Sequence, residues 1–195
     1  MLDGIKIENL SVLENEYKVK AIRLFVDSFY DMYTSISKDK KVLNDFFLNS
    51  LDCSLIYVAI FDNNIIGFMG IANNKKRTMH FDKAKCIELF GKLKGGIIYY
   101  QLRALLEKPN VKSDTDLCID YITTDENYSG KGVATKLIEY ACNNLGYKDC
   151  YLEVLSKNLT AKKMYEHNGF VEYKRVFNPV LLMGGGSIIK MKKQL

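Results

Sequence analysis

The chain has 195 residues, of which 48% are hydrophobic and 26% are charged, and its formal net charge is +5. A chain of this length can bury a full hydrophobic core, so we expect a single domain, residues 1–195. No apolar run approaches the roughly 20 residues of a membrane span, and the start of the chain lacks the basic and then apolar pattern of a signal peptide. We therefore expect a cytoplasmic protein without a membrane partner.

The cysteines and the basic residues narrow the classes of function further. The five cysteines are an odd number and form no CxxC pair, which favours reduced, buried thiols over a disulfide framework. The one basic cluster, Lys75–Arg77, is too short to predict a nucleic-acid interface and suits an anionic ligand equally well. No spacing typical of metal ligands occurs. We expect neither a nucleic-acid partner nor a metal site.

The first third of the chain shows a strand, helices and a β-hairpin. Residues 5–10 alternate apolar and polar side chains and predict a strand, and a helical pattern begins at Glu14. Its apolar face carries Ile22, Phe25, Phe29 and Met32. A second helix is expected over Lys38–Asn49. Residues 55–72 form two apolar, β-branched runs around Asp62–Asn64, which favour the left-handed turn of a tight hairpin.

A helical hairpin is expected over residues 81–107. The segment has helical spacing on both sides of Gly95 and Gly96 and ends before Pro109. We place the junction of its two helices at the paired glycines.

The rest of the chain predicts, in order, a strand, a helix, a strand, a short helix and two strands. The expected bounds are Leu117–Thr124, Gly130–Asn144, Cys150–Leu155, Asn158–His167, 170–177 and 184–193. Asn168 and Gly169 are a typical left-handed end for the short helix. No repeat, linker or low-complexity tract marks a domain boundary.

The turn YSGKGVA, Tyr128–Ala134, joins a strand to a helix. Gly130 and Gly132 lie where backbone N–H groups at a helix N-terminus can hold a phosphate; the alternative is that they only make a tight turn. The P-loop pattern GxxxxGK[ST] is absent, and a dinucleotide turn GxGxxG would need glycine at Thr135. A dinucleotide-binding fold also needs more parallel βαβ units than the chain supplies.

Two segments, YITTDENYSGKGVATKLIEYA and YLEVLSKNLTAKKMYEHNGF, together resemble the GNAT superfamily of acyl-CoA N-acyltransferases. In that family a Gln/Arg-x-x-Gly-x-Gly/Ala turn binds the pyrophosphate of coenzyme A. Its counterpart here is formed by Ser129, Gly130, Lys131, Gly132, Val133 and Ala134. The family's second pattern, Asn-x-x-Ala-x-x-x-Tyr-x-x-x-Gly-Phe, is matched by Asn158, Ala161, Tyr165, Gly169 and Phe170.

The resemblance implies an α+β fold, the acyl-CoA N-acyltransferase (GNAT) fold. Such a chain has a mixed, mostly antiparallel sheet of six to seven strands flanked by helices. The helical hairpin 81–107 would then be inserted between strands 3 and 4 and would shape the acceptor side. Ser129 departs from the family pattern, which usually has Gln or Arg there. Serine at this position removes one side-chain contact to the phosphate. Backbone N–H donors and Lys131 would replace part of this contact.

The resemblance further implies acetyl-CoA as co-substrate. Besides the glycine turn, we expect Ile122, Thr124, Asn158 and Ala161 to contact it. Backbone N–H groups near Ile122 would polarise the thioester carbonyl, provided that the fourth and fifth strands splay apart as in the family. Asn158 is also a plausible N-cap without any ligand.

Two residues are expected to be catalytic. Tyr165 would protonate the leaving thiolate; the alternative is a half-buried core tyrosine. Asp120 aligns with the position where many family members have a glutamate base, but it would need burial to act, and the alternative is that it orients a neighbouring group. Glu153, on the adjacent strand, either supports the site or faces solvent.

We therefore predict an N-acetyltransferase that transfers an acetyl group from acetyl-CoA to a primary amine, of a small molecule or a peptide, by direct attack. The alternatives are a non-catalytic acyl-CoA-binding or regulatory module of GNAT type and a dinucleotide-binding module. A homodimer is compatible with the sequence. No sequence pattern identifies the amine acceptor or the oligomeric state.

Overall fold

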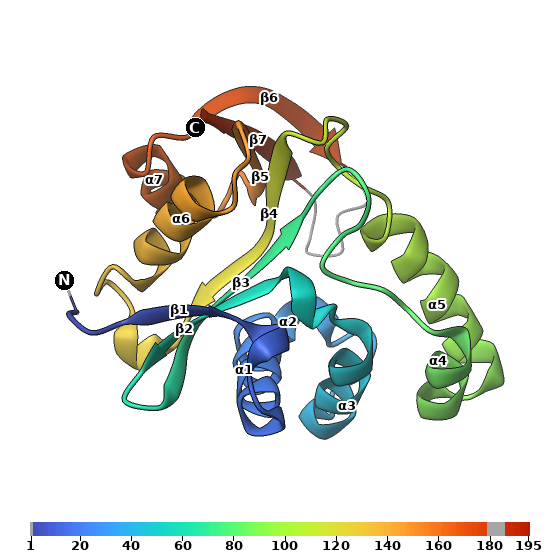
Figure 1. The fold of residues 1–195 in the computed structure, drawn as a ribbon. Coiled ribbons are helices and arrows are strands. Elements are labelled where there is room, and N and C mark those ends of the chain that lie inside the picture. Colours follow the sequence, from blue (N-terminus) through green and yellow to red (C-terminus); the bar gives the residue numbers. More distant parts are fainter. Residues whose placement is uncertain (1, 179–185) are drawn as a thin grey trace.

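The computed structural model describes residues 2–178 and 186–195. Their strands form one seven-stranded sheet in the order β1-β2-β3-β4-β5-β7-β6 (Figure 1). The strands are β1 Lys6–Asn9, β2 Ile56–Phe61, β3 Asn64–Ala72, β4 Asp116–Thr124, β5 Asp149–Leu155, β6 Val171–Asn178 and β7 Gly186–Gln194. Neighbours are antiparallel except β4 and β5, which are parallel. The mixed, mostly antiparallel sheet expected from the sequence is thus confirmed.

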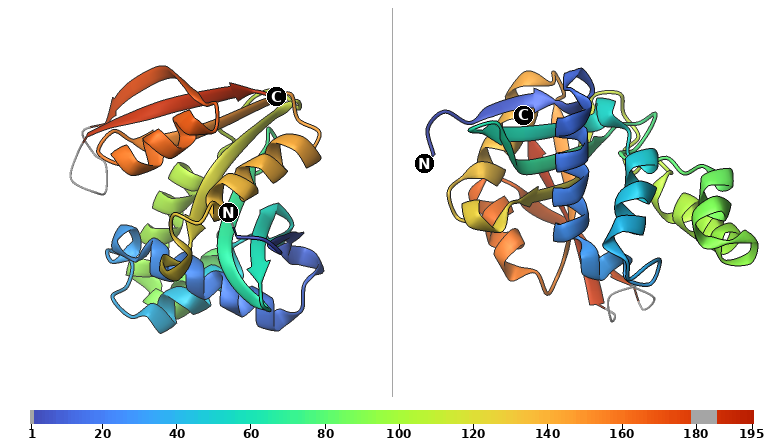
Figure 2. Two further views of the ribbon diagram at one scale, coloured as in Figure 1. Left: turned by 90° about the vertical axis from the view of Figure 1, so that its left-hand side faces the viewer. Right: turned by 90° about the horizontal axis from the view of Figure 1, so that it is seen from below.

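Helices cover both faces of this sheet (Figures 1 and 2). They are α1 Asn15–Ser28, α2 Tyr30–Tyr33, α3 Lys40–Ser50, α4 Lys83–Phe90, α5 Lys92–Leu106, α6 Val133–Asn144 and α7 Leu159–His167. The short 3-10 helices are η1 Leu10–Val12, η2 Cys53–Leu55 and η3 Glu126–Tyr128. Among the described residues, none of the helices combines the length and apolarity that crossing a bilayer requires. The strands predicted over 170–177 and 184–193 are β6 and β7, except that Gly184 and Gly185 lie outside the described residues.

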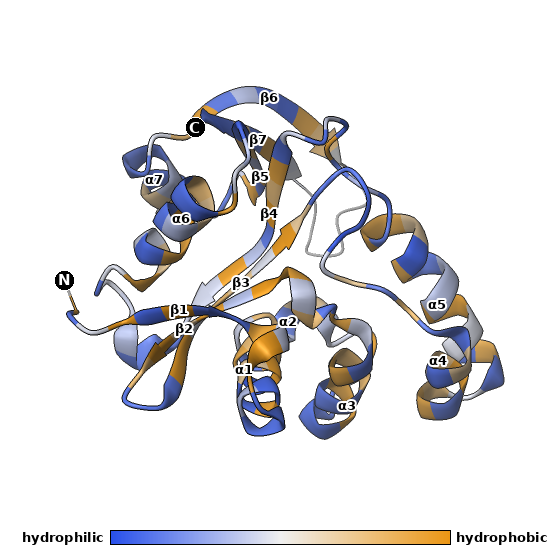
Figure 3. Cartoon of the chain, viewed as in Figure 1, coloured by the Kyte–Doolittle hydropathy of each residue, from blue (hydrophilic) through white to orange (hydrophobic). Residues whose placement is uncertain are grey.

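Two hydrophobic clusters hold the layers together, one on each face of the sheet. On the α1 face the Phe25 ring lies 5.2 Å from that of Phe68 on β3 and 5.3 Å from that of Tyr121 on β4. On the other face, Leu137 and Ile138 of α6 are fully buried against the sheet. Figure 3 shows the hydrophobic residues concentrated along β3, which is buried from Ile65 to Ala72. The central strands are therefore covered on both sides, and they position the site.

The β2–β3 turn is the tight hairpin that the sequence predicts. Asp62 and Asn63 adopt left-handed conformations, with φ of 47° and 58°. Two successive positive φ angles match the right-handed twist of the paired strands, which is why short polar residues stand here. The residues of the turn and of its two flanking strands were therefore sufficient to predict this hairpin.

The helical hairpin between β3 and β4 is present, but its junction is not where the glycine pair predicts. The chain turns at Gly91, where φ is 80°, and Gly95 and Gly96 lie inside α5. Gly95 faces α4 so closely that an added Cβ would come within 2.3 Å of the Cys86 carbonyl oxygen. The prediction of the junction was wrong because Gly95 serves a close helix crossing instead of a turn.

This close crossing gives a first prediction. Gly95→Ala should lower the melting temperature by several degrees, because the methyl group would collide with backbone atoms of α4 that cannot rotate away. Gly96→Ala is the matched control, since an added Cβ there meets nothing within 4 Å and alanine favours a helix. Thermal unfolding followed by circular dichroism measures both. Equal melting temperatures for the two variants would show that the crossing relaxes without cost.

Candidate active site

The two central strands, β4 and β5, part halfway along their length. They pair only from Asp116 with Asp149 to Ile119 with Leu152. Beyond that point β4 continues on β3 and β5 continues on β7, and no strand of the described residues pairs with the two facing edges. At the branch the register between β3 and β4 shifts, and Asp120 is the extra residue of a β-bulge. The splay anticipated from the family resemblance is therefore present in this chain.

Above the parted strands lies the N-terminus of α6. Gly130 and Gly132 both have positive φ, 71° and 83°, and Gly132 is the N-cap of the helix without any side-chain cap. Residues other than glycine rarely adopt this conformation, which explains why glycine occupies both positions. The first N–H groups of a helix have no partner within it and carry its positive dipole end. The turn thus presents bare backbone donors that suit an anion.

A cavity of about 710 Å³ occupies the space between the parted strands and this turn. Every site residue predicted from the sequence lines it except Lys131, whose ammonium lies 4.9 Å from the centre of the Tyr128 ring. Phe29 and Met32 enter it from the junction of α1 and α2, and Glu153 enters from β5. No residue of α4 or α5 lines it, so the role of the hairpin on the acceptor side stays a prediction.

Tyr165 contributes the phenol of α7 to this cavity. The residue is only 7% exposed, and its ring packs edge-on to Phe170 with centroids 6.0 Å apart. Burial, with a smaller contribution from Cys118, raises the pKa of Tyr165 to about 12. Asn158 holds the start of α7, because its side chain accepts a hydrogen bond of 3.1 Å from the Ala161 N–H. The phenol is therefore fixed in place and stays protonated at neutral pH.

Asp120 is held in a buried ion pair. Its carboxylate accepts hydrogen bonds from Arg77 Nη2 at 2.7 Å and Nε at 3.0 Å, from Thr78 Oγ1 at 3.2 Å and from Asn110 Nδ2 at 3.1 Å. The side chain of Asp120 is 1% exposed and that of Arg77 15%. Burial works to lower the pKa of Arg77, but the bonds and charge of Asp120 outweigh it and raise that pKa. The Arg77 guanidinium therefore stays charged over the physiological pH range, beside the Asp120 carboxylate.

The sequence did not reveal the partners of Asp120. Arg77 belongs to the basic cluster read only as a possible anion contact, and Asn110 follows the helical hairpin. Both come from segments whose distance from β4 depends on the tertiary fold, and no local pattern encodes it. Arg77 also donates a long hydrogen bond of 3.4 Å from Nη1 to the Leu105 carbonyl, so the ion pair links β4 to the end of α5.

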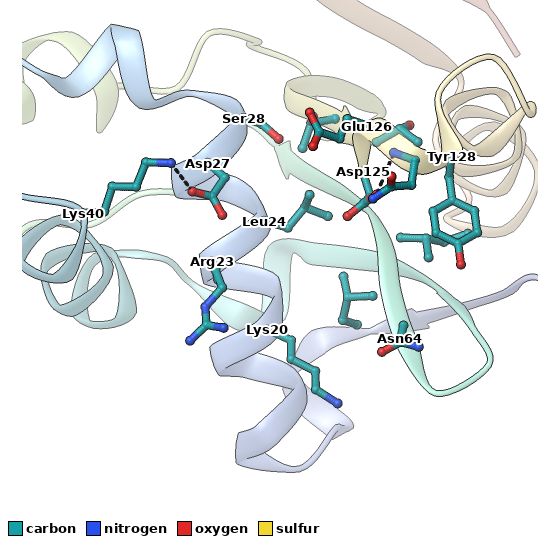
Figure 4. Close-up of a pocket in the computed structure, with 15 residues that line it drawn as sticks. Lys20, Arg23, Leu24, Asp27, Ser28, Lys40, Asn64, Asp125, Glu126 and Tyr128 are labelled. Atoms are coloured by element: carbon teal, nitrogen blue, oxygen red, sulfur yellow. Dashed lines mark hydrogen bonds and ion pairs between the residues drawn. The ribbon is translucent and has the colours of Figure 1, made fainter.

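A second cavity of about 870 Å³ adjoins the first at Thr123, Thr124 and Tyr128. It lies between α1 and η3, and Figure 4 shows Lys20, Arg23 and Asp27 in succession along α1, with Lys40 paired to Asp27. Although larger, it is lined neither by Gly130 or Gly132, nor by Tyr165, nor by any residue of β5. We therefore assign the chemistry to the smaller cavity.

Comparisons with known proteins agree with this geometry. Residues 52–172, which include the parted strands and the glycine turn, match the family model described as an acetyltransferase (GNAT) domain. The match spans more than half of the chain, which belongs to the GNAT acetyltransferase family. The search of curated proteins found no match.

Solved structures show the same fold at low sequence identity. An N-acetyltransferase from Staphylococcus aureus Mu50 has a TM-score of 0.63 at 17% sequence identity. The match covers 96% of the present chain and 100% of the Staphylococcus chain. A structure described as histone acetyltransferase HPA2 and related acetyltransferase, from Corynebacterium glutamicum, has a TM-score of 0.64 at 16% sequence identity. The match covers 97% of the present chain and 96% of the chain from Corynebacterium. A chain of the NatC complex bound to Gag peptide and CoA has a TM-score of 0.56 at 20% sequence identity. The match covers 98% of the present chain and 98% of the chain in that complex. The fold expected from the sequence is confirmed.

Proposed function

We propose that this acetyltransferase moves an acetyl group from acetyl-CoA to a primary amine by direct attack. The observation that carries the proposal is one cavity that joins the glycine turn of α6, the parted edges of β4 and β5, and the buried Tyr165 phenol. The structurally similar NatC complex, which was solved with a peptide and CoA, supports both substrates. We further propose that residues 1–195 act as one domain in the cytoplasm.

Binding of the co-substrate would divide between two parts of the cavity. The N–H groups from Ser129 to Ala134 would hold the pyrophosphate at the positive end of α6, with Lys131 adding charge at the rim. The acyl-bearing arm would lie along the free edge of β4, where backbone at Ile122 and Thr124 has no neighbour strand on the β5 side. Asn158 and Ala161 would close the other wall from α7. Together these residues would bring the thioester to the branch point of the strands.

Acetyl transfer needs a neutral amine, a polarised carbonyl and a proton for the departing thiolate. A lysine-like ammonium has a pKa of about 10.4, so a base must accept its proton at neutral pH. A backbone N–H near Ile122 would stabilise the oxyanion as it forms. Tyr165 would protonate the thiolate, because its phenol lines the cavity and is protonated. These roles require no covalent enzyme intermediate.

A turnover screen tests the proposal. The protein is mixed with acetyl-CoA and, separately, with peptides, polyamines, amino acids and aminoglycosides, and release of free coenzyme A is followed. Amine-dependent release supports the proposed function. Tight acetyl-CoA binding without release for any amine would instead support the non-catalytic module. Binding of NAD and not of coenzyme A would contradict both.

The glycine turn gives a prediction about affinity. Gly132→Val should weaken coenzyme A binding at least tenfold, about 1.4 kcal/mol, because a side chain at this N-cap would strain the turn and displace the helix N-terminus from the pyrophosphate. Gly146→Val is the matched control, since Gly146 has a similar φ of 73°, open space around it and no place in the cavity. Calorimetry that finds equal affinities for the two variants would contradict the phosphate site.

A further inference from the structure

Two carboxylates line the cavity at the place where β4 and β5 part. The last paired residues are Ile119 and Leu152, and the next residue on each strand is acidic, Asp120 on β4 and Glu153 on β5. Each carboxylate is near the strand edge that the thioester would approach. The proposed reaction needs one proton acceptor for the incoming ammonium, and the surroundings of the two carboxylates are different.

Asp120 is poorly suited to accept this proton. Both of its oxygens already accept hydrogen bonds, and its side chain is almost completely buried. Protonation would also leave the buried Arg77 guanidinium without its counter-charge, which is strongly unfavourable in a site shielded from water. The contacts favour a positioning role, in which Asp120 fixes Arg77 and the bulge of β4.

Glu153 is accessible and only partly engaged. Its side chain is 39% exposed, and Oε1 accepts a hydrogen bond of 2.6 Å from Lys190 on β7. No other side chain or backbone group of the described residues donates to this carboxylate, so Oε2 is available to a substrate or a water molecule. Among the described residues, the other ionisable groups that interact with it are Tyr173 of β6 and Cys118 of β4, and Asp120 lines the same cavity.

We propose that Glu153, and not Asp120, accepts the proton of the acceptor ammonium, directly or through one water molecule. The inference rests on the proposed function. Glu153 takes one proton, and the freed nitrogen lone pair forms the C–N bond while the carbonyl electron pair moves to oxygen. The carbonyl then re-forms and the C–S bond breaks. Sulfur receives the Tyr165 proton, the phenolate takes the second nitrogen proton, and Glu153 returns its proton to water.

Lys190 has a defined part in this arrangement. Its ammonium donates a hydrogen bond of 2.6 Å to Oε1 and so holds the Glu153 carboxylate in position, and this bond raises the pKa of Lys190. The residue acts through Glu153 and is therefore a positioning residue. Removing its ammonium should leave the Glu153 carboxylate without the contact that positions it.

The test uses the amine found in the turnover screen. Glu153→Gln should lower kcat/KM for the amine at pH 7 by roughly 10² to 10⁴ and remove the acidic limb of the pH profile, with the KM for acetyl-CoA unchanged. The loss should shrink toward pH 10 and with amines of lower pKa, since a neutral amine needs no base. Glu153→Asp should recover part of the rate, and Lys190→Met should lower kcat/KM for the amine while the KM for acetyl-CoA stays unchanged.

Asp149→Asn is the matched control, because Asp149 is also a β5 carboxylate paired with a β7 lysine, at 3.1 Å, but lies outside the cavity. It should leave the pH profile unchanged. Wild-type protein that shows no amine-dependent turnover would refute the proposed function itself. If Glu153→Gln turns over the amine with an unaltered pH profile, only the role of Glu153 is overturned. The same holds if the acidic limb of the profile is lost in folded Asp120→Asn but is kept in Glu153→Gln.

Discussion

Replacing Tyr165 by phenylalanine is expected to lower kcat by roughly 10² to 10⁴, the usual size of a general-acid contribution. Phenylalanine keeps the ring contact with Phe170 and nearly all of the buried area, so acetyl-CoA affinity and melting temperature should change little. The loss should diminish when the leaving thiol is made more acidic, because such a thiolate departs without needing the proton. Steady-state kinetics with acetyl-CoA and a more acidic acetyl thioester measure both effects.

The control for this variant is Tyr57→Phe. Tyr57 lies on β2 and packs against the same hydrophobic cluster as Tyr165, but it does not line the cavity. It should keep wild-type kcat. Turnover of Tyr165→Phe within a factor of about three of the wild type would remove the phenol from the mechanism, since such a factor is well under 1 kcal/mol of barrier.

The raised pKa of Tyr165 also predicts how the rate depends on pH. The neutral phenol is the proton donor, and a pKa of about 12 keeps it neutral throughout the range from pH 7 to pH 10. Its ionisation should therefore cause no fall in kcat within that range. A descending limb centred near pH 9, absent in Tyr165→Phe, would show that the working phenol is far more acidic than its burial implies.

The second large effect is expected at the Asp120–Arg77 pair. Asp120→Ala should lower the free energy of unfolding by about 3–5 kcal/mol, because it leaves the Arg77 guanidinium largely buried and unpaired. Replacing both residues together, Asp120→Leu with Arg77→Met, should cost less than Asp120→Ala alone. Urea unfolding measures these losses, and the single variants Asp120→Leu and Arg77→Met together with the double variant complete a double-mutant cycle that gives the coupling energy.

The exposed pair of Lys40 with Asp27 is the matched control for this comparison, since both side chains are about half exposed. Asp27→Ala should change stability by less than about 1 kcal/mol. A similarly small loss for Asp120→Ala would mean that water reaches Arg77 and that the pair does not anchor the bulge of β4. The role of Asp120 in positioning would then lose its physical basis.

Local chemistry in the sequence predicted much of this fold. The left-handed Asp62–Asn63 turn, the glycine turn before α6 and the Asn158 cap each depend on neighbouring residues. The site residues were expected from the resemblance to the GNAT family, and all of them except Lys131 line one cavity. Interactions over long sequence separations were not predictable. Arg77 reaches Asp120 only because β3 and β4 pair and the bulge turns the carboxylate toward the β3–α4 connection.

The Gly95–Gly96 pair shows why glycine alone misleads. The same residue type marks a turn at Gly91 and a close helix crossing at Gly95, and only the three-dimensional packing distinguishes them. The two carboxylates at the strand branch present the same difficulty. Sequence placed Asp120 at the family position of a base, whereas the accessibility of Glu153 depends on which side chains surround each group.

The central claim is that the cavity between β4 and β5 transfers an acetyl group from acetyl-CoA to an amine nitrogen. Mass spectrometry of the amine after incubation with acetyl-CoA tests it most directly, with wild-type protein and Tyr165→Phe side by side. The account predicts one added acetyl group on nitrogen, formed together with free coenzyme A, and far less product with the variant. Release of coenzyme A without an acetylated amine, or equal product with both proteins, would contradict it.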